Sequence, residues 1–179
     1  MRSMKKILNK GFFERDTRQV ARGLLGMFLV RRIRGKEIAS MITEVEAYDG
    51  PHDRASHAAK GETPRTKTMF GAPGCWYVYF TYGMHWMLNI VTGERGYPAA
   101  VLIRGTDAVS GPGRLTKYFT ITGALNAKPA ERSAGLWIED RGIRVSLSAI
   151  QKSARIGVSY AGPVWAKKEY RFYLKAREK

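Results

Sequence analysis

The chain has 179 residues, of which 44% are hydrophobic, and both values are ordinary for a globular domain. It carries 31 lysines and arginines against 15 aspartates and glutamates, and its formal net charge of +16 favours a polyanionic partner such as DNA or RNA. A single cysteine excludes an internal disulfide and a multi-cysteine metal site, and no apolar stretch reaches membrane-spanning length. We therefore expect one domain over residues 1–179, in a reducing, cytoplasmic compartment.

The first predicted elements are a helix and a β-hairpin. Apolar residues recur at near-helical spacing over residues 12–29, and Asp16 offers a cap for this helix. Residues 28–34 and 37–48 have the pattern of two strands joined by a short turn, which predicts a hairpin. Apolar and polar residues alternate in the second strand, so one face is expected to carry Ile42, Glu44, Glu46 and Tyr48.

A long loop and a three-stranded meander follow. Residues 50–72 are rich in Gly, Pro, Ser and Thr and lack an apolar period, which predicts a functional or mobile loop. Residues 75–80, 85–91 and 99–104 are strand-like and are separated by short turns, which predicts an antiparallel meander. Alternation in the first of these strands assigns Trp76, Val78 and Phe80 to the core and Tyr77 and Tyr79 to the opposite face.

The last part of the chain adds one helix and several short strands. The patterns predict a helix over residues 114–125, short strands within residues 136–150 and a final strand over residues 170–175. Internal repeats and linkers are absent from the sequence. Because strands and helices are segregated rather than regularly alternating, the fold class is expected to be α+β.

Two groups of side chains have the composition of a reaction site. If the strand over residues 99–104 lies near Glu46, then Arg104 favours the ionised form of this carboxylate, which acts as a general base toward water. Nucleic-acid bases stack on aromatic rings, and such rings are supplied by Tyr48, His57, Tyr77 and Tyr79. Tyr82 falls in the turn after Tyr79 and is expected to project from a hairpin tip, where an aromatic ring can wedge into a duplex.

Two other functions stay open on these patterns alone. A metal-dependent nuclease needs ligands for Mg²⁺ or Mn²⁺, and suitable side chains lie close together in Glu44, Glu46, Asp49, Asp53 and His57. A basic chain with exposed aromatic residues also suits a nucleic-acid-binding protein without catalytic activity. The sequence contains no zinc-ligand spacing, Walker loop, GxGxxG or GxSxG motif, so we expect no metal and no nucleotide cofactor.

Short strings spread over nearly the whole chain carry a more specific signal. They include Glu44-Val45-Glu46-Ala47-Tyr48-Asp49-Gly50-Pro51, Ala55-Ser56-His57, Tyr77-Val78-Tyr79, Tyr82-Gly83-Met84, Val101-Leu102-Ile103-Arg104, Ser110-Gly111-Pro112 and Ala154-Arg155-Ile156-Gly157-Val158. In this order and spacing the sequence resembles the alkyladenine (3-methyladenine) DNA glycosylases, in a compact bacterial form. The resemblance implies a single domain with a curved antiparallel β-sheet flanked by helices.

The resemblance also implies roles for particular residues in the reaction. Glu46 would activate the water that attacks the sugar C1′, and Arg104 and the carbonyl group of Ile156 would help to hold that water. No lysine is among the pocket residues to supply an amine nucleophile, so the implied enzyme is a monofunctional glycosylase of base excision repair that leaves an intact abasic site.

Further residues are implied to bind the damaged base. Tyr48 and His57 would flank one face of the flipped purine, and Tyr79 would flank the other. Asn89 and Leu102 would shape the pocket and exclude normal purines.

A third set is implied to contact the duplex. Tyr82 would fill the gap left by the flipped base, with Met84 and His85 beside it at the hairpin tip. The implied partner is double-stranded DNA with damaged purines, bound by a monomer.

Overall fold

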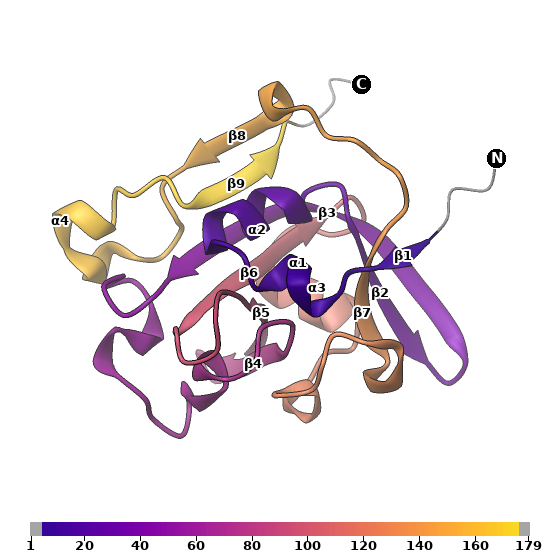
Figure 1. Cartoon of the computed structure of the whole chain (residues 1–179), viewed down its shortest axis with the longest axis horizontal. Helices are drawn as coiled ribbons and strands as arrows, with labels where there is room; N and C mark the ends of the chain where they lie inside the picture. The colour runs from indigo at the N-terminus through magenta and orange to yellow at the C-terminus, as the bar shows by residue number, and fades with distance from the viewer. Residues whose placement is uncertain (1–4, 176–179) are drawn as a thin grey trace.

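A nine-stranded antiparallel sheet organises the chain in the computed structural model, which describes residues 5–175 (Figure 1). The main path of the sheet runs β1-β7-β2-β3-β6-β5-β4, and β9 pairs with both β3 and β8. The strands are β1 (Lys6–Ile7), β2 (Phe28–Ile33), β3 (Lys36–Asp49), β4 (Trp76–Thr81), β5 (His85–Val91), β6 (Ala99–Thr106), β7 (Leu136–Asp140), β8 (Ile150–Ser153) and β9 (Arg171–Leu174). The predicted hairpin (β2–β3), the predicted meander (β4–β5–β6) and the α+β class are confirmed.

Within residues 5–175 the α-helices are fewer than the strands, and none is longer than eight residues. The α-helices are α1 (Lys10–Phe13), α2 (Thr17–Leu24), α3 (Pro112–Tyr118) and α4 (Gly162–Trp165). Single turns of 3₁₀-helix occur at His57–Lys60, Lys67–Phe70, Gly123–Leu125, Arg132–Ala134, Leu147–Ala149 and Ser159–Ala161. No helix within residues 5–175 is long and apolar enough to cross a bilayer.

Two predicted helices were too long. The helix expected over residues 12–29 is divided into α1 and α2, although Asp16 does cap α2 by accepting the N–H groups of Arg18 and Gln19. The chain leaves α2 at Gly26, whose φ of +89° is a left-handed conformation that a side chain opposes. The helix expected over residues 114–125 ends at Tyr118, because Thr120 also has a positive φ, of +50°.

Strand β3 is the longest element and changes partners along its length. Its first half pairs with β2, whereas its second half lies between β6 and β9. The register shifts between Ile42 and Val45, which is the signature of a β-bulge. Ile42 is consequently buried in the core and does not share the face of Glu46, so that part of the predicted alternation was wrong.

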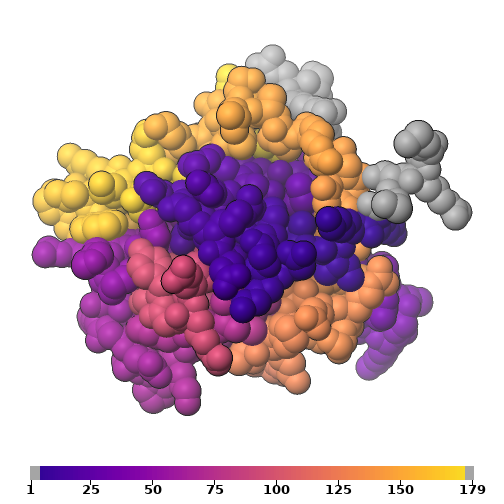
Figure 2. Space-filling model, viewed as in Figure 1, coloured from indigo at the N-terminus to yellow at the C-terminus, as the bar shows by residue number. Residues whose placement is uncertain are grey.

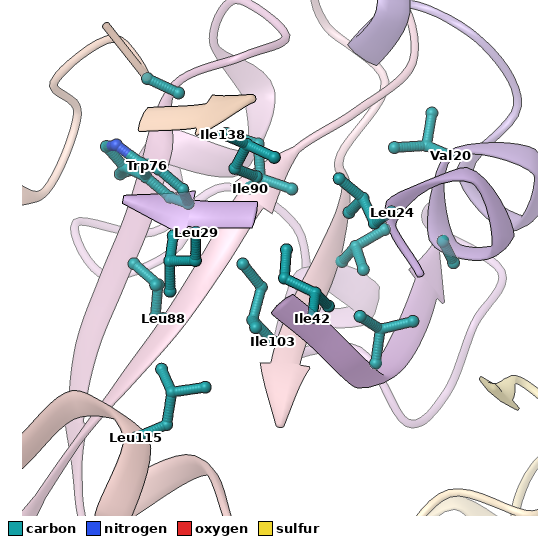
Figure 3. Close-up of a cluster of buried hydrophobic side chains, with 14 of the residues drawn as sticks. Val20, Leu24, Leu29, Ile42, Trp76, Leu88, Ile90, Ile103, Leu115 and Ile138 are labelled. Atoms are coloured by element: carbon teal, nitrogen blue, oxygen red, sulfur yellow. The ribbon is translucent and has the colours of Figure 1, made fainter. Parts of the chain in front are cut away.

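Helices α2 and α3 cover one face of the sheet and enclose the main hydrophobic core. Figure 3 shows Val20 and Leu24 of α2 beside Ile42 of β3, with Leu115 of α3 farther along the same core. Burial of each such side chain contributes about 1.5–3 kcal/mol to folding. In the space-filling view the N-terminal segment that contains α2 covers the centre of this side of the molecule (Figure 2).

The predicted core face of β4 is confirmed only in part. Trp76 and Val78 are buried in the main core, but Phe80 is 45% exposed. Near its tip the β4–β5 hairpin extends beyond the core. Phe80 therefore points to the same side as Trp76 and Val78 but is not covered by the core. The face that carries Tyr77 and Tyr79 is separate from the main core, as predicted.

Candidate active site

The centre of the site is the carboxylate of Glu46, which has no exposed surface. Three groups surround it. The backbone N–H of Ile156 donates to Oε1 at 2.8 Å, and the Tyr48 hydroxyl donates to Oε2 at 2.9 Å. The Arg104 guanidinium lies 3.5 Å from Oε1, because β6 pairs with β3 at this point. The structure therefore brings together all three residues implied for catalysis, and Ile156 contacts Glu46 through its N–H.

Burial raises the pKa of Glu46 above its ordinary value of 4.5. Arg104, the Ile156 N–H and the Tyr48 hydroxyl act in the opposite direction without outweighing the loss of water. Arg104 thus favours the ionised form of Glu46, as expected, but burial outweighs it and the net shift of the pKa is upward. A carboxylate that is more basic than it would be in water is suited to accept a proton from a water molecule.

Glu44, two residues earlier on β3, has a different environment. Its Oε1 accepts hydrogen bonds from Arg104 at 2.9 Å and from Arg171 of β9 at 2.7 Å. Burial alone would raise the pKa of Glu44, but the two arginines outweigh it and the net direction is downward. One carboxylate is therefore held as an ion-paired anion and the other is made more basic, which is a usual way of separating roles in a site.

A buried ion pair between Asp53 and Arg155 lies next to Glu46, and no sequence pattern predicted it. The Arg155 Nη2 lies 2.8 Å from Asp53 Oδ1, and both side chains lack exposed surface. Arg155 also donates to the Ala47 carbonyl at 2.8 Å, and its guanidinium carbon lies 4.8 Å from the centroid of the Tyr48 ring. The pair thereby ties the loop after β3 to the segment that supplies the Ile156 N–H.

The sequence offered little signal for this pair. Asp53 appeared only as a possible metal ligand, and the two partners are 102 positions apart. Only the fold reveals that one charge neutralises the other.

The rings of His57, Tyr77 and Tyr79 form an aromatic wall on the same face of the sheet as Glu46. The rings of His57 and Tyr79 meet edge to face with centroids 4.7 Å apart, and His57 Nδ1 lies 3.4 Å from the Tyr77 hydroxyl. Burial, with a contribution from Arg65, lowers the pKa of His57, which favours the neutral ring. A base held between His57 and Tyr79 requires these rings to move apart, and their base-binding roles stay a prediction.

Asn89 and Leu102 lie between the aromatic wall and the carboxylate. Both are buried, and they are direct neighbours across β5 and β6. Leu102 is also the cross-strand partner of Glu46, and Asn89 Nδ2 donates to the Tyr77 carbonyl at 3.1 Å. The sheet register thus places both residues beside Glu46, and their roles in shaping the pocket and excluding normal purines stay predictions.

The residues implied to contact the duplex gather at the tip of the β4–β5 hairpin. Tyr82 is 80% exposed and has a φ of +53°, and Met84 and His85 are exposed beside it. The His85 ring lies against Gly113 at the start of α3, where an added Cβ would come within 2.8 Å of it. The hairpin tip therefore exposes the Tyr82 ring, and the neighbouring His85 packs against the start of α3.

Most of the acidic side chains considered as metal ligands are paired with arginine side chains. Glu44 is paired with two arginines, Asp53 with Arg155, and Asp49 lies 3.7 Å from Arg18. In the described part of the chain, no group of three or more His, Cys, Asp or Glu side chains is arranged to hold a metal ion. This arrangement gives the nuclease hypothesis no support.

Similarity to known proteins extends over almost the whole chain. A sequence model described as methylpurine-DNA glycosylase (MPG) matches residues 11–110 and 106–178. A relative from Methanocella arvoryzae is 42% identical over 94% of this chain and 92% of its own length. Relatives from Legionella pneumophila strain Paris (43%, 96% of each chain) and Anaeromyxobacter dehalogenans strain 2CP-C (42%, 94% and 83%) carry the same name, "Putative 3-methyladenine DNA glycosylase".

The structure places a buried glutamate close to several aromatic rings in a strongly basic chain. The sequence matches described above cover almost all of this chain. The chain belongs to the methylpurine-DNA glycosylase family. It is accordingly an enzyme of the DNA glycosylase class, which hydrolyses N-glycosyl bonds, and the resemblance described above is confirmed.

Proposed function

We propose that this protein is a monofunctional glycosylase that removes alkylated purines from duplex DNA by means of a water molecule activated by Glu46. The observation that carries the proposal is the environment of this carboxylate: it is buried, its pKa is raised, and three neighbours hold it in one orientation. General bases in enzymes have these properties.

The proposed reaction needs one proton transfer and one displacement. A water molecule gives a proton to Glu46 and its oxygen attacks C1′ of the damaged nucleotide. The electron pair of the breaking C1′–N bond goes to the purine, and a base alkylated at N3 or N7 leaves as a neutral molecule because it carries a positive charge before cleavage. The Ile156 carbonyl is proposed to hold the water, while its N–H orients Glu46.

Binding of the flipped base is assigned to the aromatic wall. Electron-rich rings attract a cationic purine by about 0.5–2 kcal/mol each, and Tyr48, His57 and Tyr79 are the proposed rings, with Asn89 and Leu102 limiting the shape of the base. Reaching such a pocket requires the base to leave the stack, at a cost of a few kcal/mol. Preference for alkylated purines follows because their positive charge strengthens the contact with these rings and weakens the C1′–N bond.

The duplex is proposed to be held by charge and by the hairpin tip. A net charge of +16 gives sequence-independent, salt-sensitive attraction to phosphates. The exposed ring of Tyr82 is proposed to enter the gap left by the flipped base, with Met84 and His85 against the neighbouring base pairs. We propose that the protein acts as a monomer without a cofactor, in the cytoplasm, where bacterial DNA is located.

The test is the change Glu46→Gln, which keeps the shape of the side chain and removes its basicity. Release of 3-methyladenine or 7-methylguanine from a defined duplex, measured by chromatography under single-turnover conditions, is expected to fall at least about 100-fold. Binding to a duplex with an abasic analogue is expected to persist. Glu169→Gln is the matched control, because Glu169 is exposed and its ion-pair partner within residues 5–175 is the exposed Lys152. Normal base release by Glu46→Gln would refute the mechanism.

Assays with excess EDTA separate the remaining alternatives. A glycosylase is expected to keep its activity and to leave strands that break only after heat or alkali. Loss of activity with EDTA, together with direct strand breaks, would indicate a metal-dependent nuclease instead. Tight binding to undamaged DNA with no released base would indicate a binding protein.

A further inference from the structure

An open pocket lies on the β4–β5 hairpin, and Glu46 is not among its lining residues. It is open, has a volume of about 360 Å³ and follows the free edge of β4. Its walls include Arg65, Tyr79, Phe80, Trp86, Gly123 and Asn126. Tyr79 belongs to the aromatic wall of the proposed reaction site and Arg65 packs against its ring, whereas the other lining residues lie apart from that wall. We call this the edge pocket.

The floor of the edge pocket is an aromatic pair. Phe80 and Trp86 are direct cross-strand neighbours, with ring centroids 4.9 Å apart and planes inclined by 54°. Phe80 is 45% exposed although its sequence position predicted core. Gly123 packs so closely on Trp86 that an added Cβ would come within 2.7 Å of the indole ring. The 3₁₀ turn Gly123–Leu125 thus holds Trp86 in place, and the Phe80 ring stays partly open to solvent.

The free edge of β4 adds backbone polar groups to the pocket. Trp76 exchanges hydrogen bonds with Lys128 and Ala127 at this edge, and the Val78 N–H donates to Asn126 Oδ1 at 3.0 Å. By alternation the N–H and C=O of Phe80 point to the same edge. No hydrogen-bond partner for these two groups is found within residues 5–175. One donor and one acceptor therefore face the pocket.

Arg65 supplies a positive charge at the rim. Its guanidinium carbon lies 4.9 Å from the centroid of the Tyr79 ring, and it has no carboxylate partner in the described part of the chain. A flat aromatic surface, a free backbone donor and acceptor, and an unneutralised arginine are together the features that bind a nucleotide by its base, base edge and phosphate.

We infer that the edge pocket receives the base of the opposite DNA strand, which loses its partner when the damaged purine is flipped. This inference rests on the proposed function. Tyr79 and Phe80 are successive residues of β4 and therefore face opposite sides of the hairpin that ends in Tyr82. With Tyr82 between the strands, the damaged nucleotide lies on the Tyr79 side, and the unpaired base lies on the side of Phe80 and Trp86.

The test compares two duplexes that differ only in the opposite base. Both contain an uncleavable tetrahydrofuran abasic analogue in place of the lesion; one carries adenine opposite it, and the other carries a second tetrahydrofuran. The wild-type protein is expected to bind the first duplex about five-fold or more tightly, since stacking of one base on an aromatic side chain is worth about 1–3 kcal/mol.

Variants then assign this preference to the edge pocket. Phe80→Leu keeps an apolar side chain but removes the flat ring, and Phe80→Ala removes most of the contact; each is expected to bring the ratio of the two Kd values toward one. Tyr118→Ala is the matched control, because Tyr118 has the same 45% exposure and does not line the pocket. Tyr118→Ala is expected to keep the wild-type ratio.

Two outcomes overturn the inference in different ways. If wild type and Phe80→Leu have the same ratio while both release alkylated purines, the edge pocket has no such role and the proposed function stands. If the wild type releases no damaged base from any lesion duplex, the proposed function fails and the inference fails with it. A lowered ratio in Phe80→Leu, with purine release retained at saturating enzyme, supports both.

Discussion

Replacing Asp53 by asparagine removes the counter-charge of a guanidinium that has no exposed surface. In the native protein Arg155 Nη2 lies 2.8 Å from Asp53 Oδ1, and Asp53 also accepts the N–H groups of Asp49 and Ala55 at 3.0 Å each. Asparagine keeps one acceptor oxygen, so part of this backbone network survives. The charge of Arg155 is then buried without its carboxylate partner, and breaking such a pair costs about 3–5 kcal/mol.

This loss is large relative to the total stability of a domain, which is about 5–15 kcal/mol. Urea unfolding of Asp53→Asn, followed by far-UV circular dichroism, is expected to show a lower midpoint with an unchanged slope. Glu169→Gln is again the control, because its partner Lys152 lies 2.8 Å away on the surface and exposed pairs contribute at most about 1 kcal/mol.

The substitution is also expected to slow base release by the protein that remains folded. Arg155 lies against Tyr48 and precedes Ile156, so a displaced Arg155 disturbs two of the groups that hold Glu46. If Asp53→Asn were as stable as Glu169→Gln, the buried pair would not be what ties the loop after β3 to the segment that carries Ile156.

Three further outcomes are expected. Because Glu46 acts as a base only when ionised and burial raises its pKa, single-turnover base release should increase with pH through a value above 4.5 and then level off; a flat profile would contradict the assignment. Tyr82→Ala should weaken binding to lesion duplexes by removing the exposed wedge while leaving thermal stability nearly unchanged, and equal affinity would remove its proposed role. Affinity for undamaged DNA should fall linearly with salt on logarithmic axes, and insensitivity to salt would argue against phosphate contacts by the basic surface.

Local patterns predicted those parts of the fold that depend on neighbouring residues. The β2–β3 hairpin and the β4–β5–β6 meander follow from alternation and turn residues, and Asp16 caps α2 as its side chain allows. The helix over residues 12–29 was predicted too long because apolar spacing does not reveal that the chain reverses at Gly26. The bulge after Ile42 was invisible for the same reason, since it depends on pairing with β6.

The amino-acid sequence by itself determined the basic charge, the α+β class and the family, and it named Glu46 and Arg104 as candidates, because composition, short-range periodicity and ordered motifs are properties of the linear chain. Only the tertiary structure decided that Asp53 neutralises Arg155, that Glu44 and Glu46 have opposite pKa shifts, and that Phe80 is open to solvent. These properties depend on burial and on contacts between residues far apart in the sequence, and both exist only after β3, β6 and β9 have come together.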